Sequence, residues 1–204
     1  GGIFGQAGQI CSAMARVVVH KSVKDELVEK LAEMASGLKV GAGNVDGVEL
    51  TPLISEQQLQ KVENFSRSGQ QAGAEAVAGG KRIDRDGYFF EATVFDNVKP
   101  DMTIAQEEIF GPVLSVLTYE DKDEAIHIAN DTAFGLAAGV FTKDINQATE
   151  TVNQMQAGQV YVNSWFTGSV ATPFGGYKQS GYSREKGQEA IKSYLQVKNV
   201  GIQL

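Results

Sequence analysis

Short runs of apolar and β-branched residues alternate along this 204-residue chain with segments of helical periodicity. The expected strands lie at 16–20, 74–78, 88–95, 113–117, 137–141 and 159–163. The expected helices lie at about 22–38, 55–69, 123–130, 145–155 and 185–194, the first opened by a capping box at Ser22 and Asp25. Helical spacing predicts an apolar face of Val23, Leu27, Leu31, Met34 and Leu38 on the first helix and of Leu59, Val62 and Phe65 on the second. Continuous apolar strands are typical of sheets covered on both faces. The pattern therefore predicts an α/β fold with a largely parallel sheet flanked by helices on both faces.

Composition and charge narrow the class of protein. Hydrophobic residues make up 42% and charged residues 21% of the chain, which is typical of a globular protein that folds. The net charge of −7, with no run rich in Lys or Arg, argues against a nucleic acid partner. The longest apolar stretches, such as Leu136–Phe141, are too short to span a bilayer, so we expect no membrane partner.

Cys11 is the only cysteine. A single thiol excludes an intramolecular disulfide and a multi-cysteine zinc site, and it fits a reducing compartment, so we expect a cytoplasmic protein. The preceding segment Gly5–Ile10 contains glycines that permit positive φ and let backbone amides point at a ligand near the thiol. Cys11 is thus a candidate nucleophile, and a buried structural cysteine is the alternative.

Two further segments carry candidate site residues. In Glu107-Glu108-Ile109-Phe110-Gly111-Pro112, a carboxylate can accept hydrogen bonds from a ribose diol, although adjacent acids are more often simply exposed to solvent. The segment 173–181 combines aromatic residues with glycines. This combination is expected of a pocket wall, and equally of a turn. Trp165 and Phe166 belong either to the core or to an apolar substrate channel.

His20 and His127 are the only histidines, and they do not have the spacing of metal ligands. A dyad of either histidine with Cys11 would be needed for a thiol hydrolase. The chain could also be a folded module that binds partners without catalysis.

Taken together and in this order, residues 4–11, 107–112 and 173–181 resemble the motifs of the aldehyde dehydrogenase superfamily. The resemblance extends over essentially the whole chain. It implies a catalytic domain over residues 1–195, followed by a strand over 196–204 that joins the sheet of a neighbouring subunit. The implied assembly is a homo-oligomer, a dimer or a tetramer.

The same resemblance implies a reaction and a cofactor. The Cys11 thiolate would add to an aldehyde, hydride would pass to the nicotinamide ring of NAD or NADP, and water would hydrolyse the thioester. The backbone amide of Cys11 would donate a hydrogen bond to the oxyanion formed in this step. Glu108 would hold the nicotinamide ribose, and Phe110 would pack near the nicotinamide. Among the branches of the superfamily, this hydrolytic one fits better than the CoA-acylating or phosphorylating ones.

For the aldehyde pocket the resemblance points to Trp165, Gly168 and Phe174. Phe174 matches a position that often lines the substrate tunnel. At Gly168 many relatives carry a bulky aromatic side chain, so we expect a wider pocket mouth, or one filled by Trp165 or Phe166.

The chain also departs from the family pattern. The glycine-rich cofactor fold, the general-base glutamate and the oxyanion asparagine of the family all precede the cysteine loop, and none is present here. The sequence opens at Gly1 without an initiator Met. We therefore expect a piece of a longer polypeptide that, by itself, neither holds the dinucleotide tightly nor deacylates quickly.

Overall fold

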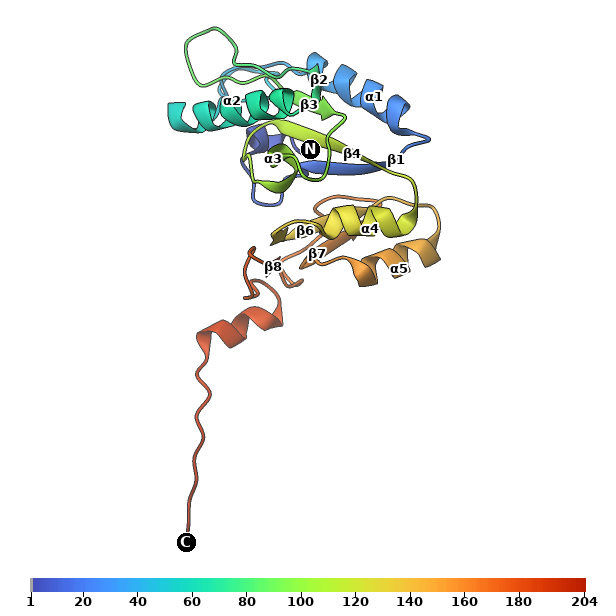
Figure 1. Ribbon diagram of the computed structural model, residues 1–204. Coiled ribbons are helices and arrows are strands. Elements are labelled where there is room, and N and C mark those ends of the chain that lie inside the picture. Colours follow the sequence, from blue (N-terminus) through green and yellow to red (C-terminus); the bar gives the residue numbers. More distant parts are fainter. Residues whose placement is uncertain (1) are drawn as a thin grey trace. The chain divides into compact units, whose positions relative to one another are not determined.

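The computed structural model describes residues 2–204 (Figure 1). The chain divides into two compact units, the first ending at Thr132 and the second comprising Ala133–Leu204. Among the described residues, no helix is both long and apolar enough to cross a membrane.

The first unit is built around a four-stranded sheet in the order β1-β4-β3-β2. β1 (Arg16–His20), β4 (Val113–Tyr119) and β3 (Thr93–Asp96) are parallel, and β2 (Glu75–Ala78) adds an antiparallel edge. All four residues of β3 are buried, so this strand is covered on both faces. The prediction of an α/β fold with a parallel-dominated sheet is confirmed.

Helices flank this sheet. α1 (Lys24–Gly37) packs on β2 and β3, α2 (Glu56–Gln71) on β2, and α4 (Lys122–Asn130) on β1 and β4. A short helix, α3 (Thr103–Gln106), packs against α2, and a 3-10 helix, η1 (Gly5–Gly8), precedes β1.

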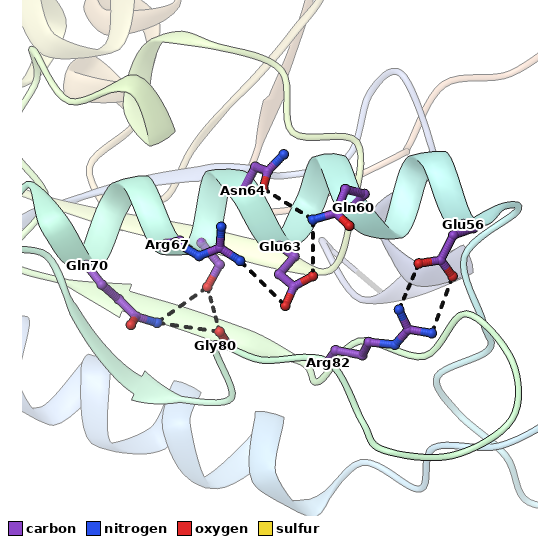
Figure 2. Close-up of polar contacts among 9 residues, drawn as sticks. Glu56, Gln60, Glu63, Asn64, Arg67, Gln70, Gly80 and Arg82 are labelled. Carbon is purple, nitrogen blue, oxygen red and sulfur yellow. Dashed lines mark hydrogen bonds and ion pairs between the residues drawn. The ribbon is translucent and has the colours of Figure 1, made fainter.

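α2 follows the sequence prediction closely. It begins after Ser55, whose hydroxyl caps the helix by accepting a hydrogen bond from Gln58 N at 3.2 Å. Leu59 and Val62 are fully buried on its apolar face. Its polar side is tied to the segment after β2, because Gln70 donates to the carbonyl of Gly80 and Glu56 binds Arg82 (Figure 2).

α1 differs from its prediction. The expected capping box is wrong, because the Ser22 hydroxyl pairs with His20 Nδ1 at 2.7 Å and the helix begins at Lys24 without a side-chain cap. The expected apolar face is also partly wrong, since Val23 and Met34 are half exposed. Burial falls instead on Val28 and Ala35, because small side chains fit closest to the sheet.

The second unit contains two small sheets. β6 (Ala137–Val140) and β7 (Gln159–Val162) are parallel and are connected through α5 (Ile145–Gln154), which confirms the predicted strand-helix-strand unit. β5 (Phe134–Gly135) pairs antiparallel with β8 (Tyr177–Lys178), a short strand inside the segment 173–181 for which the sequence predicted a pocket wall or a turn.

The C-terminal end has less regular structure than expected. The predicted helix at 185–194 is a 3-10 helix, η2 (Gln188–Tyr194). Residues 196–204 form neither helix nor strand, and side chains such as Val197 and Leu204 are fully exposed. A strand requires a partner for its backbone groups, so pairing of this segment with a second subunit stays a prediction.

A buried carboxylate links α1 to the sheet. Asp96 ends β3 and is buried, and its Oδ2 lies 2.6 Å from the Nζ of Lys24 in the first turn of α1. Its other oxygen, Oδ1, is buried without a hydrogen-bond partner in the described part of the chain. The hydrogen bond to Asp96 raises the pKa of Lys24 above its usual 10.5. Lys24 is therefore the counter-charge on which burial of Asp96 depends.

We expect Lys24→Met to lower the free energy of unfolding by about 1–3 kcal/mol in urea titrations, because it leaves the Asp96 carboxylate buried and unpaired. This loss of stability is smaller than the loss expected on breaking a fully buried ion pair, since Lys24 retains some contact with solvent. The matched control is Lys30→Met on the same helix, whose partner Glu26 is exposed and whose loss should have a much smaller effect. Equal effects of the two substitutions would contradict this account.

The same pair predicts a pH dependence. Because folding raises the pKa of Lys24, its stabilisation is complete below 10.5 and is lost as the pH rises through the raised value. The difference in stability between the native chain and Lys24→Met should therefore shrink in strongly alkaline solution. A difference that stays constant with pH would show that charge is not its cause.

Candidate functional site

Cys11 lies in the loop between η1 and β1, where its side chain is exposed. A hydrogen bond of 3.0 Å from Ala13 N to the carbonyl of Ile10 closes a turn around it. The alternative of a buried structural cysteine is therefore wrong for the described chain. The thiol is open to a reagent or substrate that approaches from solvent.

The loop before Cys11 has an unusual backbone. Gln6, Ala7 and Gly8 all have positive φ, at 49°, 55° and 71°. The sequence indicated this conformation only for glycine, since a Cβ atom disfavours it in Gln and Ala. Three successive residues of this kind turn the chain sharply just before Cys11.

This turn brings the Cys11 loop against the segment that carries Glu108 and Phe110. A Cβ atom on Gly8 would lie 2.0 Å from the carbonyl oxygen of Gly111, so only glycine fits between the two backbones. The structure thus unites two segments that are about a hundred positions apart in the sequence.

Residues at the start of α2 and just before it support both segments. The Nε2 atom of Gln58 donates to the carbonyl oxygens of Ile109 at 3.0 Å and of Phe110 at 2.8 Å. On the other side, Gln9 Oε1 accepts a hydrogen bond of 3.0 Å from Ile54 N. Gln58 was not predicted from the sequence, because its only local signal is a polar residue next to the buried stripe of α2.

Glu108 and Phe110 have different surroundings. Glu108 is exposed, and across residues 2–204 its carboxylate makes neither an ion pair nor a hydrogen bond. Phe110 is half-buried and has a positive φ of 58°. An exposed carboxylate without an internal partner is able to accept hydrogen bonds from two neighbouring hydroxyl groups.

The histidines do not form a dyad with Cys11. Both ring nitrogens of His20 have other partners, since Nδ1 lies 2.7 Å from Ser22 Oγ and Nε2 lies 3.0 Å from the carbonyl oxygen of Glu120. His127 is exposed on α4. Within the part of the chain described, no group of His, Cys, Asp and Glu side chains is arranged to hold a metal ion.

Trp165, Gly168 and Phe174 belong to the second unit. Trp165 is half-buried in an aromatic cluster, with ring centroids 5.6 Å from Tyr161 and 6.0 Å from Phe166. Burial raises the pKa of the Tyr161 hydroxyl. Gly168 is exposed and has open space around it, since an added Cβ would meet only the Thr172 hydroxyl at 3.3 Å.

Phe174 is held on two sides. Its backbone exchanges two hydrogen bonds of 2.7 Å with Glu185, and its ring lies 5.2 Å from the ammonium group of Lys186. The next residue, Gly175, lies so close to Gly158 that a Cβ on Gly158 would meet the Gly175 carbonyl oxygen at 1.8 Å. Contact between a glycine and a neighbouring carbonyl therefore fixes this segment as it fixes the Cys11 loop.

Comparison with known proteins gives a consistent result. The Aldehyde dehydrogenase family profile matches residues 1–200. The chain is 44% identical over 203 residues to a putative aldehyde dehydrogenase, DhaS, of Bacillus subtilis, covering all of this chain and 41% of that protein. It is 43% identical to a betaine aldehyde dehydrogenase of Brucella anthropi, with 100% and 42% covered. It is 44% identical to a mitochondrial benzaldehyde dehydrogenase of Antirrhinum majus, with 97% and 37% covered.

Solved structures agree with the sequence relatives. A variant of the aldehyde dehydrogenase from Bacillus cereus superposes with a TM-score of 0.94 at 44% identity, covering 97% of this chain and 40% of that one. An NAD+ complex of the Bacillus cereus enzyme gives a TM-score of 0.92, with 94% and 39% covered. The chain thus spans about 40% of the length of the proteins that it matches.

We expect Gly8→Ala to destabilise the first unit by about 2–4 kcal/mol, because it combines an unfavourable positive φ with a clash against the Gly111 carbonyl. It should also change the rate at which iodoacetamide alkylates Cys11, measured by mass spectrometry. Gly5→Ala is the control, since a Cβ there meets nothing within 4 Å. If Gly8→Ala behaves like Gly5→Ala in both measurements, the two segments are not coupled through Gly8.

Proposed function

The chain belongs to the aldehyde dehydrogenase family, and on this premise we propose that it carries the nucleophile of an NAD(P)-dependent oxidation of aldehydes to carboxylates. The observation that carries the proposal is the exposed Cys11 on a loop that packs, through Gly8, against the segment of Glu108 and Phe110. This arrangement places a free thiol and an unpaired carboxylate on two adjoining segments.

In the proposed reaction the Cys11 thiolate adds to the carbonyl carbon of the aldehyde and forms a thiohemiacetal. The backbone amide of Cys11 donates to the oxygen that becomes negatively charged in this step. Hydride then leaves the same carbon, and NAD(P)+, when bound, would supply its acceptor. The product on Cys11 is a thioester, which water hydrolyses to the carboxylate and the free thiol.

Glu108 and Phe110 are the residues that we propose for the cofactor. The Glu108 carboxylate fits the two hydroxyl groups of the nicotinamide ribose, because it is exposed and offers acceptors only. Phe110 would lie beside the nicotinamide ring. The NAD+ complex of the Bacillus cereus relative supports a nicotinamide dinucleotide for this chain as well.

For the aldehyde pocket we propose Trp165, Phe174 and the open space at Gly168. Two relatives are named for different aldehydes, benzaldehyde and betaine aldehyde. We therefore expect variation at these pocket positions to determine which aldehyde is accepted.

We further propose that residues 196–204 pair with a neighbouring subunit in a homo-oligomer, a dimer or a tetramer. The exposed side chains of Val197, Val200, Ile202 and Leu204 would then be covered. An exposed free thiol suits a reducing compartment, which supports a cytoplasmic location.

The rival thiol hydrolase has less support. It needs a general base beside Cys11, and both ring nitrogens of His20 have other partners. Hydrolysis of activated esters without dinucleotide would nevertheless favour it. A non-catalytic module would show neither that activity nor aldehyde oxidation.

We expect Cys11→Ser to lower aldehyde-dependent formation of NADH by about a thousandfold or more, because a serine hydroxyl without an adjacent base is a poor nucleophile. The assay follows NADH absorbance in the protein at its full natural length. Ser12→Ala, which alters the neighbouring residue, should retain most of the activity. Undiminished oxidation in Cys11→Ser would exclude Cys11 as the nucleophile.

Glu108→Gln should raise KM for NAD+ by about tenfold, since replacing one acceptor oxygen by an amide donor weakens the bonds to the ribose hydroxyls. Glu107→Gln removes the same charge from the adjacent exposed position and is the matched control. Similar kinetic constants for the two variants would mean that Glu108 does not contact the cofactor.

A further inference from the structure

Asn163 ends the parallel pair of β6 and β7. Val140 lies opposite Val162 in this pair, and Asn163 N continues the ladder with a bond of 2.9 Å to the carbonyl oxygen of Val140. Its side chain then adds one more pair of hydrogen bonds to this ladder. Oδ1 accepts a hydrogen bond of 2.9 Å from Thr142 N, and Nδ2 donates one of 2.8 Å to the carbonyl oxygen of Thr142. The amide thus pairs with Thr142 as a backbone strand would.

The backbone of Asn163 explains why a side chain takes this role. Its φ is 52°, so the main chain turns away from β6 at this residue and cannot continue the ladder itself. Asparagine tolerates this conformation better than most residues. Its short side-chain amide also offers a donor and an acceptor side by side, which a carboxylate, an apolar side chain or a glycine does not. Asn163 therefore combines tolerance of a positive φ with a side chain that can pair with the Thr142 backbone.

The amide connects two loops that leave the same end of the sheet. On one side, Thr142 Oγ1 accepts a hydrogen bond from Asp144 N, and Asp144 caps α5. On the other side, the chain beyond Asn163 leads within two residues to Trp165. A change at Asn163 would release the start of this second loop from β6.

The Trp165 side chain packs against β6, two residues beyond the turn at Asn163. Its six-membered ring rests on Gly139 of β6, where a Cβ atom would meet Trp165 Cζ3 at 2.9 Å and Cε3 at 3.0 Å. Tyr161, the neighbour of Gly139 on β7, contributes a tilted ring contact. The indole therefore packs against Gly139, where a side chain is missing, two residues beyond the Asn163 turn.

We propose that Asn163 is a positioning residue that determines the position of the Trp165 indole, which packs on Gly139. Asn163 thereby determines the size of aldehyde that is accepted. The part that concerns aldehydes rests on the proposed function. The part that concerns the indole rests on the contacts described above.

The chain offers a direct readout, because Trp165 is its only tryptophan. In Asn163→Gly the positive φ is retained at no cost while both side-chain bonds are lost. We expect its tryptophan emission to shift to longer wavelength and its quenching by acrylamide to increase, with the far-UV circular dichroism unchanged. An emission spectrum and a quenching constant equal to those of the native chain would overturn the proposal.

Asn97→Gly is the matched control. Asn97 also has a positive φ, of 56°, and is exposed, but it lies in the first unit. Its substitution should leave the signal of Trp165 unchanged. A shift of equal size in Asn97→Gly would attribute the effect to general loosening and would overturn the proposal.

Asn163→Asp tests the donor separately. It keeps the acceptor for Thr142 N but places a carboxylate oxygen against the Thr142 carbonyl oxygen. The emission should shift as in Asn163→Gly at neutral pH and return toward the native spectrum in mildly acidic solution, where the protonated carboxyl donates again. A spectrum without this pH-dependent recovery would contradict the role of the donor.

The consequence for selectivity is tested in the protein at its full natural length. In Asn163→Gly and Gly139→Ala, the ratio of kcat/KM for a bulky and a small aldehyde should change by about tenfold or more, with kcat for the small aldehyde nearly unchanged. A shifted indole with an unchanged ratio would overturn the link to aldehyde size. If the native protein oxidises no aldehyde, the proposed function fails, and the fluorescence still decides the role of Asn163.

Discussion

The close approach of Gly8 to the carbonyl group of Gly111 determines how the candidate site in the first unit is assembled. The approach requires an absent side chain, a positive φ at Gly8, and a firm support beneath Gly111, which the Val62 side chain of α2 supplies. Gln58 holds the carbonyl groups of the two preceding residues. The Cys11 loop and the segment of Glu108 and Phe110, which are distant in sequence, are thus held together beside α2.

The second unit uses the same kind of constraint. Gly158 approaches the Gly175 carbonyl beside Phe174, and Gly139 provides the surface on which Trp165 lies. In each case the missing side chain lets the backbone or an aromatic ring come into close contact. The residues proposed for chemistry and for selection lie in loops, and the strands and α2 fix those loops in place.

The elements with strong periodicity were predicted from sequence, and those that depend on distant partners were not. The stripe of Leu59 and Val62 on α2 was correct because it reflects burial within one helix. The capping box at Ser22 was wrong for a local reason, because the ring of His20, two residues earlier, takes that hydroxyl. Among site residues, the sequence singled out Cys11 and Glu108, but the positive φ at Gln6 and Ala7 and the bonds of Gln58 depend on contacts across the chain. Such contacts leave no local pattern.

The chemical state of Cys11 during turnover shows whether this thiol is the nucleophile. The protein is mixed with an aldehyde and NAD+, quenched with acid, and digested for mass spectrometry. If Cys11 is the nucleophile, it carries an acyl group with the mass of the aldehyde less one hydrogen in place of the thiol proton, and it carries none when NAD+ is omitted. Formation of NADH and carboxylate without any acyl group on Cys11, under conditions where hydrolysis of the thioester is slow, would contradict it.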